Sequence, residues 1–227
     1  PGRYDRCASS IFSEQDFESD SERFEKLWEC ASVYEQNEQF FENWTADEPH
    51  AAIFFSRHSS NIHRLTSGAD LHMCSLRGWS RAFTSRSIPF GVIDENSIGE
   101  LKNTKLLILP RVTSLDESAA EKILDFAAKG GTLFCEAETG AWNELGFRRD
   151  RRNRLFAEAA GIIEYQRQAA SKDKFKFKFQ NDTFALSPGA WVTPLRPIRG
   201  VTENMIPFES DKSLMLNFLY GSGAVIL

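Results

Sequence analysis

Residues 105–135, KLLILPRVTSLDESAAEKILDFAAKGGTLFC, indicate the fold class more clearly than any other stretch of the chain. The first six form an apolar run ending in proline, which is typical of a strand buried on both faces of a parallel sheet. Ser114 and Glu117 then have the spacing of a capping box, a helical apolar face follows, and Gly130 and Gly131 predict its end. The last four residues form another apolar run. The stretch therefore predicts strand, helix and strand in succession.

The same alternation extends toward the N-terminus. Residues 51–55 and 90–94 are short apolar runs that predict two more strands. Apolar residues at helical spacing predict a helix over residues 71–83, whereas the polar residues 59–69, which include a glycine, predict a loop. Strands alternating with helices predict an α/β domain, an open parallel sheet with helices on both faces.

The pattern changes toward the C-terminus. Residues 154–160 predict one more helix, and residues 174–179 then alternate lysine with phenylalanine, which predicts a half-buried strand with its lysines outward. Residues 214–218 and 224–227 are two apolar runs joined by a glycine-containing turn, which predicts a hairpin. We therefore expect the α/β sheet to be followed by a small antiparallel β region.

The N-terminal part has a helical pattern of its own. Apolar and aromatic residues recur at three- and four-residue steps through residues 13–45, which predicts one long amphipathic helix preceding the sheet. Its aromatic face requires a partner, either the following domain or another subunit. The expected organisation is a linker and helix over residues 1–48 and an α/β domain over residues 49–227, of which residues 172–227 form the irregular, β-rich part.

Composition limits the partners. Apolar residues make up 41% and charged residues 26% of the 227 residues, as in ordinary globular proteins. The net charge of −5 argues against a nucleic-acid partner, and no apolar run approaches the roughly 20 residues of a membrane helix, so we expect no membrane partner. The polar start without methionine suggests a piece of a longer chain. Its location stays open: the cytoplasm is favoured, and a secreted or periplasmic location is the alternative.

Several segments together resemble a known family. They occur in the order AAIFFSR (51–57), GWSRAF (78–83), IPFGVI (88–93), KLLILPRV (105–112), SLDESAAEKILDFAAKGG (114–131) and TLFCEAETG (132–140). This set resembles the β-galactosidase trimerisation domain, the middle domain of β-galactosidase-type glycoside hydrolases, and the equivalent domain of amylase-superfamily hydrolases. The resemblance covers residues 20–160 well and residues 185–227 loosely.

The resemblance implies a flavodoxin-like fold of the class I glutamine amidotransferase type. It also implies a non-catalytic role in a homo-oligomer: subunit association and support of a neighbouring active site, with carbohydrate bound by the parent protein. In that family the catalytic carboxylates lie on a (β/α)8 barrel, which alone needs about 250 residues and does not fit beside this domain. The helix over residues 13–45 resembles the stretch that links the barrel to the middle domain.

An amidotransferase-like enzyme is one alternative. Such enzymes carry a nucleophilic cysteine on a sharp, glycine-flanked turn after the strand that corresponds to residues 132–135, with a histidine base nearby. Cys135 instead falls inside the expected strand, no glycine flanks it, and every histidine precedes it. We therefore expect a buried thiol in the sheet. The other cysteines are too scattered in sequence to form a zinc site, and we expect neither a metal nor a cofactor.

Glu136 and Glu138 suggest a hydrolase as a second enzymatic alternative. If the strand continued through them, both carboxylates would lie on one face about 7 Å apart, and paired carboxylates hydrolyse glycosides. Two solvated carboxylates at the edge of the sheet are the simpler interpretation.

Five residues follow expected strands and form the candidate site. Arg57 and His58 follow the first strand, and Glu136, Glu138 and Trp142 follow the fourth. Because ligands of open parallel sheets lie at the carboxyl ends of the strands, these residues predict a rim that contacts a ligand or another subunit.

Two surface features allow further alternatives. Trp79, Trp142 and Trp191 would serve a carbohydrate-binding module. The arginine-rich residues 148–154 would bind phosphate, or would be a solvated helix start or pair with the acidic N-terminal helix.

Overall fold

The protein is described by a computed structural model. The structure describes residues 21–43, 48–101, 103–150, 156, 161–165, 168–169, 175–179, 182–186, 191–197, 201–208 and 212–227. Contacts divide the chain into two compact units, Pro1–Asp47 and Glu48–Leu227. No helix among these residues is both long and apolar enough to cross a membrane.

Within residues 21–43, the described part of the first unit, there are two helices where the sequence predicts one. Helix α1 spans Ser21–Gln36 and α2 spans Glu38–Glu42. They are separated at Asn37, whose side-chain amide donates to the carbonyl of Val33 while its backbone N–H bonds three residues back, to Tyr34. An asparagine side chain that bonds the backbone in this way competes with the helical pattern. The rest of the predicted helix, residues 13–20 and 44–45, lies outside the described residues.

The second unit contains three α-helices, one 3₁₀ helix and the strands, among the residues described. The helical elements are α3 (Arg57–Ser67), α4 (Leu71–Ser85), η2 (Ile98–Glu100) and α5 (Glu117–Ala128). The strands are β1 (Ala51–Phe54), β2 (Phe90–Ile93), β3 (Leu106–Leu109), β4 (Thr132–Cys135), β5 (Ile162–Glu164), β6 (Gln168–Ala169), β7 (Phe175–Phe179), β8 (Asp182–Leu186), β9 (Trp191–Val192), β10 (Leu195–Pro197), β11 (Val201–Phe208), β12 (Lys212–Tyr220) and β13 (Gly223–Ile226).

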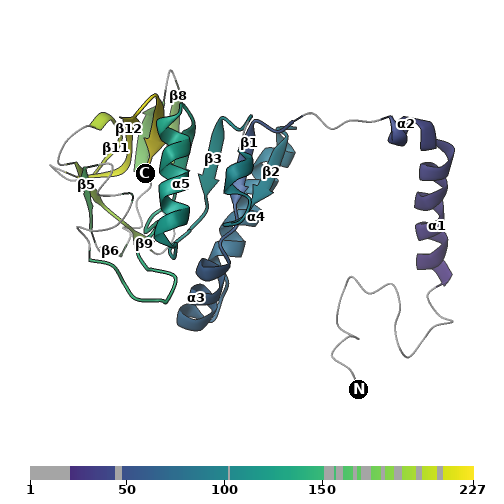
Figure 1. The fold of residues 1–227 in the computed structure, drawn as a ribbon, viewed down its shortest axis with the longest axis horizontal. Helices are drawn as coiled ribbons and strands as arrows, with labels where there is room; N and C mark the ends of the chain where they lie inside the picture. The colour runs from purple at the N-terminus through teal and green to yellow at the C-terminus, as the bar shows by residue number, and fades with distance from the viewer. Residues whose placement is uncertain are drawn as a thin grey trace. The chain divides into compact units, whose positions relative to one another are not determined.

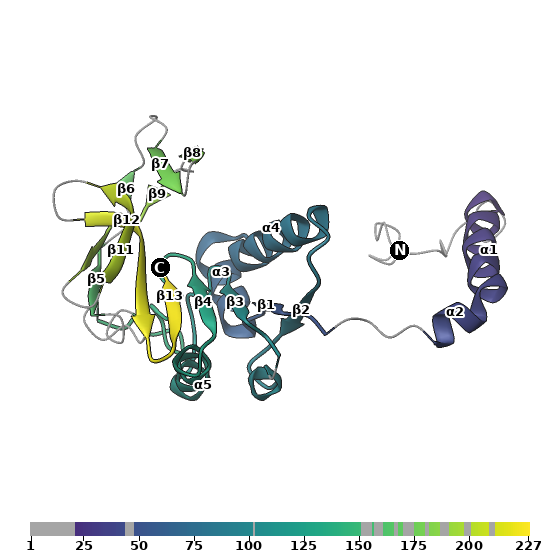
Figure 2. The ribbon, with the colours of Figure 1, turned by 90° about the horizontal axis from the view of Figure 1, so that it is seen from above.

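The main sheet is mixed. Its strand order is β2-β1-β3-β4-β13-β12-β10-β5, with β11 also paired to β12 (Figures 1 and 2). Pairing is parallel from β2 to β13 and antiparallel beyond. The strands expected near residues 51–55, 90–94, 105–110 and 132–135 are confirmed. The C-terminal hairpin is confirmed too, but it is not confined to a separate antiparallel region, because β13 pairs in parallel with β4 and continues the main sheet.

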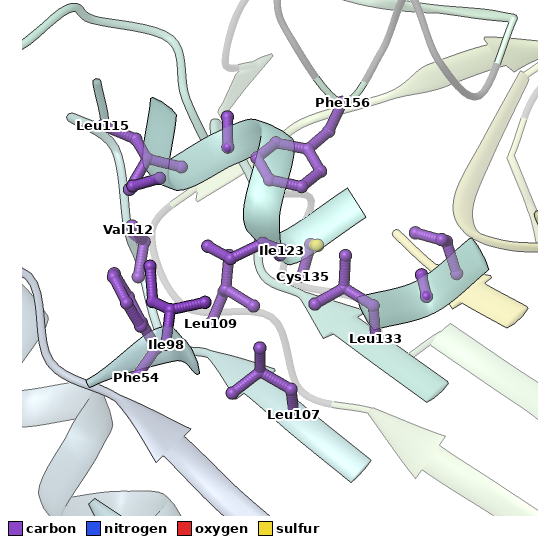
Figure 3. Close-up of a cluster of buried hydrophobic side chains, with 14 of the residues drawn as sticks. Phe54, Ile98, Leu107, Leu109, Val112, Leu115, Ile123, Leu133, Cys135 and Phe156 are labelled. Atoms are coloured by element: carbon purple, nitrogen blue, oxygen red, sulfur yellow. The ribbon is translucent and has the colours of Figure 1, made fainter. Parts of the chain in front are cut away.

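Helix α5 covers one face of the parallel strands, and Figure 2 shows it on the opposite side from α3 and α4. The parallel register places Leu107 between Ala52 of β1 and Leu133 of β4. These side chains, with alternate neighbours along each strand, form one core with the inner face of α5 (Figure 3). Burying each large aliphatic side chain in this way contributes about 1.5–3 kcal/mol to stability.

Helix α4 covers the other face of the sheet. Ile53 and Ile108, which alternate with the α5-facing residues along their strands, pack with Leu76 and Phe83 of this helix. Trp79 packs edge-on against Phe134 of β4, with ring centroids 5.1 Å apart. Because both faces of the central strands are covered, the strands are apolar throughout, as the sequence predicts.

The predicted loop over residues 59–69 is wrong, because helix α3 occupies most of it. Ser56 caps this helix by accepting the N–H of Ser59, and Gly68 ends it in the left-handed conformation. The buried residues of α3 are Ser59, Ser60 and His63. A helix with a polar buried face lacks the apolar period on which the prediction relied.

The cap of α5 also differs from the prediction. Asp116, rather than Ser114, is its N-cap and accepts the N–H of Ala119. Ser114 instead donates to the carbonyl of Asn143. Of the predicted helix over residues 154–160, only Phe156 lies among the described residues, and β7 with β8 confirms a strand in the lysine–phenylalanine segment.

Candidate functional site at the carboxyl edge of the sheet

The order of the strands determines where a ligand would be expected. From β1 the chain crosses one face through α3 and α4 to β2, whereas from β3 it crosses the opposite face through α5 to β4. Connections that diverge from adjacent parallel strands leave a crevice at the strands' carboxyl ends, which is the usual ligand position in such sheets. Here that crevice lies between the residues after β1 and those after β3.

Serine side chains close this crevice. The hydroxyl of Ser59 accepts the N–H of Ser114 at 2.9 Å and donates to the carbonyl of the same residue at 2.9 Å. The hydroxyl of Ser56 donates to that carbonyl as well, at 3.1 Å. All three residues are fully buried. The backbone groups that would meet a ligand at this position are therefore already bonded within the protein.

His72, a residue of α4, connects the segment after β1 to the segment after β3. Its Nε2 accepts the backbone N–H of Ser56 at 2.9 Å, so Nδ1 carries the proton and donates to the carbonyl of Pro110 at 2.6 Å. Burial lowers the pKa of His72 below its ordinary value, although the Pro110 carbonyl and nearby carboxylates act in the opposite direction. The ring is a neutral structural link and has no lone pair left to act as a base.

The α3–α4 junction is tied together by Asp70, the N-cap of α4. Its carboxylate accepts hydrogen bonds from the N–H of Met73, from Ser60 at 2.5 Å and from Arg64 at 3.1 Å. Burial acts to raise the pKa of Asp70, but the bonds from Ser60 and Met73 and the charge of Arg64 outweigh it and lower the pKa.

Cys135 ends β4 with its side chain directed into the α5-facing core. Its sulfur lies among hydrocarbon side chains that include Ile123 and Phe156 (Figure 3). Burial, and then the nearby carboxylate of Glu164, raise the pKa of the Cys135 thiol well above its ordinary value. A nucleophilic cysteine requires the thiolate, which this environment disfavours.

Glu136 and Glu138 do not form a pair on one face, because β4 ends at Cys135 and a turn begins. One carboxylate oxygen of Glu136 accepts hydrogen bonds from Ser75 at 2.6 Å and from the indole of Trp79 at 2.7 Å, both on α4. Glu138 is buried, has a φ of 64°, and places its carboxylate 3.7 Å from the guanidinium of Arg148. The two side chains therefore have different partners.

Trp142 lies on a short hairpin, residues 142–148. Backbone bonds join Trp142 to Thr113 and Leu115, so this hairpin is fixed to the segment that follows β3. A groove of about 440 Å³ separates it from α3, with Trp142, Glu138 and Arg148 on one side and the α3 residues His63, Thr66 and Ser67 on the other. The structure thus brings Glu138 and Trp142 to one groove.

The predicted rim residues Arg57 and His58 do not line this groove. Arg57, exposed, and His58, half-buried, open helix α3. In the part of the chain described, no hydrogen bond or ion pair joins either of them to Glu136, Glu138 or Trp142. Nor does any group of three or more histidine, cysteine or carboxylate side chains among the described residues have the arrangement of a metal site.

A second cavity, of about 260 Å³, contains two polar residues that the sequence analysis missed. Glu164 on β5 accepts the N–H of Glu138 at 2.5 Å, and Arg111 after β3 has a φ of 45°. The Nε of Arg111 is buried and has no hydrogen-bond partner among the described residues. A glutamate inside the apolar sequence Ile-Ile-Glu-Tyr was the available signal for Glu164. No sequence signal marked the left-handed backbone of Arg111.

These observations describe a class of protein: an α/β domain in which serine and histidine side chains bond the backbone groups between the ends of β1 and β3. The chain belongs to the β-galactosidase trimerisation domain family, whose model matches residues 49–200. No curated protein matches the chain in sequence.

Solved structures show the same fold at low sequence identity. A catalytic mutant of Gan42B, a GH42 β-galactosidase from G. stearothermophilus, has a TM-score of 0.73 at 19% identity and covers 96% of this chain. The β-galactosidase from Bacillus circulans sp. alkalophilus has a TM-score of 0.66 at 14% identity over 78% of the chain. The matched regions are 32% and 28% of those proteins' chains, so this chain spans about a third of their length.

Proposed function

We propose that this chain is a non-catalytic domain that associates subunits of a larger glycoside hydrolase of the β-galactosidase type. The observation that carries the proposal is the closed crevice between β1 and β3, where Ser56, Ser59 and His72 bond the backbone groups a ligand would use. The family to which the chain belongs supports the associating role. Carbohydrate would be bound by the parent protein, outside the chain.

We propose a flavodoxin-like, amidotransferase-type architecture for the domain. Its support is the order of the parallel strands, β2-β1-β3-β4-β13, which is the 2-1-3-4-5 order of doubly wound sheets of this type. The proposed limits are residues 1–48 for the linker and helix and residues 49–227 for the domain, with residues 172–227 as its β-rich part.

Of the predicted rim, we propose that Trp142, Glu138 and the adjoining groove contact another subunit. The support is their common location beside α3 and the exposed side of the Arg148–Glu138 ion pair. Glu136 has a structural role in this proposal, because its carboxylate connects the end of β4 to two donors of α4. Arg57 and His58 open helix α3 and do not line this groove, so we propose a separate subunit contact for them.

The test is enzyme activity in a full-length protein that contains this chain. Cys135→Ala, Glu136→Gln and Glu138→Gln are made singly, and glycoside hydrolysis is measured per assembled molecule after the oligomer is purified. We expect activity within about twofold of the parent for each, since none of these groups takes part in the chemistry. A loss of a hundredfold or more at Glu138→Gln, with assembly intact, would favour the hydrolase alternative.

A further inference from the structure

Two residues with strained backbone line the 260 Å³ cavity. Arg111 follows β3 with a φ of 45°, and Glu138 follows the neighbouring strand β4 with a φ of 64°. Residues other than glycine are destabilised in this left-handed conformation, and they concentrate at ligand sites. Ser87 is the one other such residue in the described part of the chain, and it does not line the cavity. The strain is therefore concentrated at this cavity.

Opposite charges line the cavity without pairing with each other. Glu164 is 5% exposed and accepts the N–H of Glu138 at 2.5 Å, whereas Arg111 has a buried Nε that lacks a hydrogen-bond partner among the described residues. No ion pair within this described part joins Arg111 to Glu164. A carboxylate accepts about four hydrogen bonds, so Glu164 can bind a ligand in addition to the partners it has.

The two other carboxylates of the lining interact with groups outside it. Glu136 accepts its hydrogen bonds from Ser75 and Trp79, and Glu138 lies 3.7 Å from the guanidinium of Arg148. None of these three donors lines the cavity. The charged groups that a ligand would meet are therefore one carboxylate, that of Glu164, and one guanidinium, that of Arg111.

Much of the remaining lining is apolar. It includes Phe156 and Ile162, both buried, together with Leu195 of β10 and Met215 of β12. A volume of 260 Å³ corresponds to about nine water molecules, so the cavity has room for a compound of about nine non-hydrogen atoms. Apolar walls with a few polar groups are typical of small-molecule sites. A matching ligand is small, has an apolar body and carries one charge of each sign.

We infer that this cavity binds a small aminocarboxylate with an aliphatic body, its ammonium group at Glu164 and its carboxylate at Arg111. Both groups would form charge-assisted hydrogen bonds, which are stronger than those between neutral groups. A simple amine or a simple carboxylic acid would leave one of the two protein charges unmatched. The inference goes beyond the associating function and does not depend on it, because the cavity lies within the single unit Glu48–Leu227.

The first experiment is calorimetric titration of the 227-residue chain with L-leucine and with 6-aminohexanoate. These two isomers carry the same charges at different separations, and hexanoate and hexylamine, with one charge each, are the matched controls. At least one isomer should bind with a dissociation constant of about 1 mM or lower, and each control should bind at least about tenfold more weakly. Equal binding of either control, or no binding of both isomers up to about 10 mM, would overturn the inference.

The second experiment places the ligand in the cavity. Glu164→Gln, which keeps an oxygen for the N–H of Glu138, and Arg111→Gln should each weaken binding of the isomer at least about tenfold. Glu121→Gln removes an exposed carboxylate of α5 outside the lining and should bind as the unmodified chain does.

Thermal unfolding checks that each variant is folded. Unchanged affinity in either folded cavity variant would contradict the assignment. If a cavity variant does not fold, the comparison of one-charge and two-charge ligands on the unmodified chain decides. Because the mass of the unmodified chain is measured separately, failure of this inference would leave the associating function standing.

Discussion

At the scale of single residues, His72 shows how a histidine becomes structural. Both of its ring nitrogens are bonded to backbone groups of the two strand ends, and one accepts while the other donates. Protonation would place an N–H at Nε2 opposite the N–H of Ser56. The folded state therefore holds the neutral ring, and its stability depends on pH.

The pH dependence has a definite sign. The pKa of His72 is lowered in the folded state, so between that value and about 6.5 the unfolded chain binds a proton that the folded chain does not. We expect the free energy of unfolding measured in urea to be highest above pH 6.5. It should fall on acidification by up to about 1.4 kcal/mol per pH unit from this residue.

His72→Gln should remove this contribution, because an amide can donate and accept as the ring does but does not titrate. His50→Gln, at an exposed histidine, serves as the control and should retain the slope. An unchanged slope in His72→Gln would show that the ring is not held neutral.

Cys135 provides a second prediction at this scale. Because its thiol is buried with a raised pKa, iodoacetamide at pH 8 should leave it unmodified in the native chain, while the exposed thiols of Cys30 and Cys74 react. Mass spectrometry of peptides, before and after unfolding in urea, distinguishes the three positions. Modification of Cys135 in the native state at a rate near that of Cys74 would revive the amidotransferase alternative.

At the level of helices and strands, the sequence predicted the elements that bury an apolar face. Strands β1 to β4 and helices α4 and α5 bury alanine, isoleucine, leucine and phenylalanine. These apolar residues recur in the sequence as the short runs and helical spacings from which strands and helices are predicted. Helix α3 was missed because its buried side is formed by two serines and a histidine, although Ser56 and Gly68 were cap signals at its ends. The alternative of paired carboxylates required β4 to continue through Glu136 and Glu138, but the strand ends at Cys135, where the apolar run of the sequence ends.

The contact between α5 and the β12–β13 hairpin depends on glycine. A methyl group at Gly223 would overlap the backbone carbonyl oxygens of Gly131 and Ala127, and Ser222 donates to the carbonyl of Ala128 at 2.9 Å. Gly223→Ala should therefore lower the free energy of unfolding by about 2–3 kcal/mol, because backbone atoms must move apart.

Gly78, on α4, provides the matched control for this substitution. Its added methyl group would meet no atom within 4 Å. Gly78→Ala should stabilise the chain by about 0.5–1 kcal/mol through helix propensity. Urea unfolding of both variants measures the contrast, and equal effects at the two positions would contradict the packing described.

At the scale of the whole molecule, local patterns predicted the parallel strands but not the full sheet. The pairing of β13 with β4 joins residues far apart in the chain, and hydrophobic period alone does not specify such a partner. For the same reason, the sequence did not show which residues of the candidate rim line one groove. Trp142 and Glu138 meet at one groove because a hairpin folds back onto the segment after β3, whereas Arg57 and His58 begin a helix the sequence did not reveal.

The proposed function is the association of subunits by this chain. Sedimentation equilibrium of the 227-residue chain tests it most directly, because it measures mass without assuming a shape. We expect a mass that exceeds the 25.8 kDa of one chain by a whole-number factor, in a reversible equilibrium with monomer on dilution. A single species of 25.8 kDa at all concentrations up to the millimolar range would contradict it.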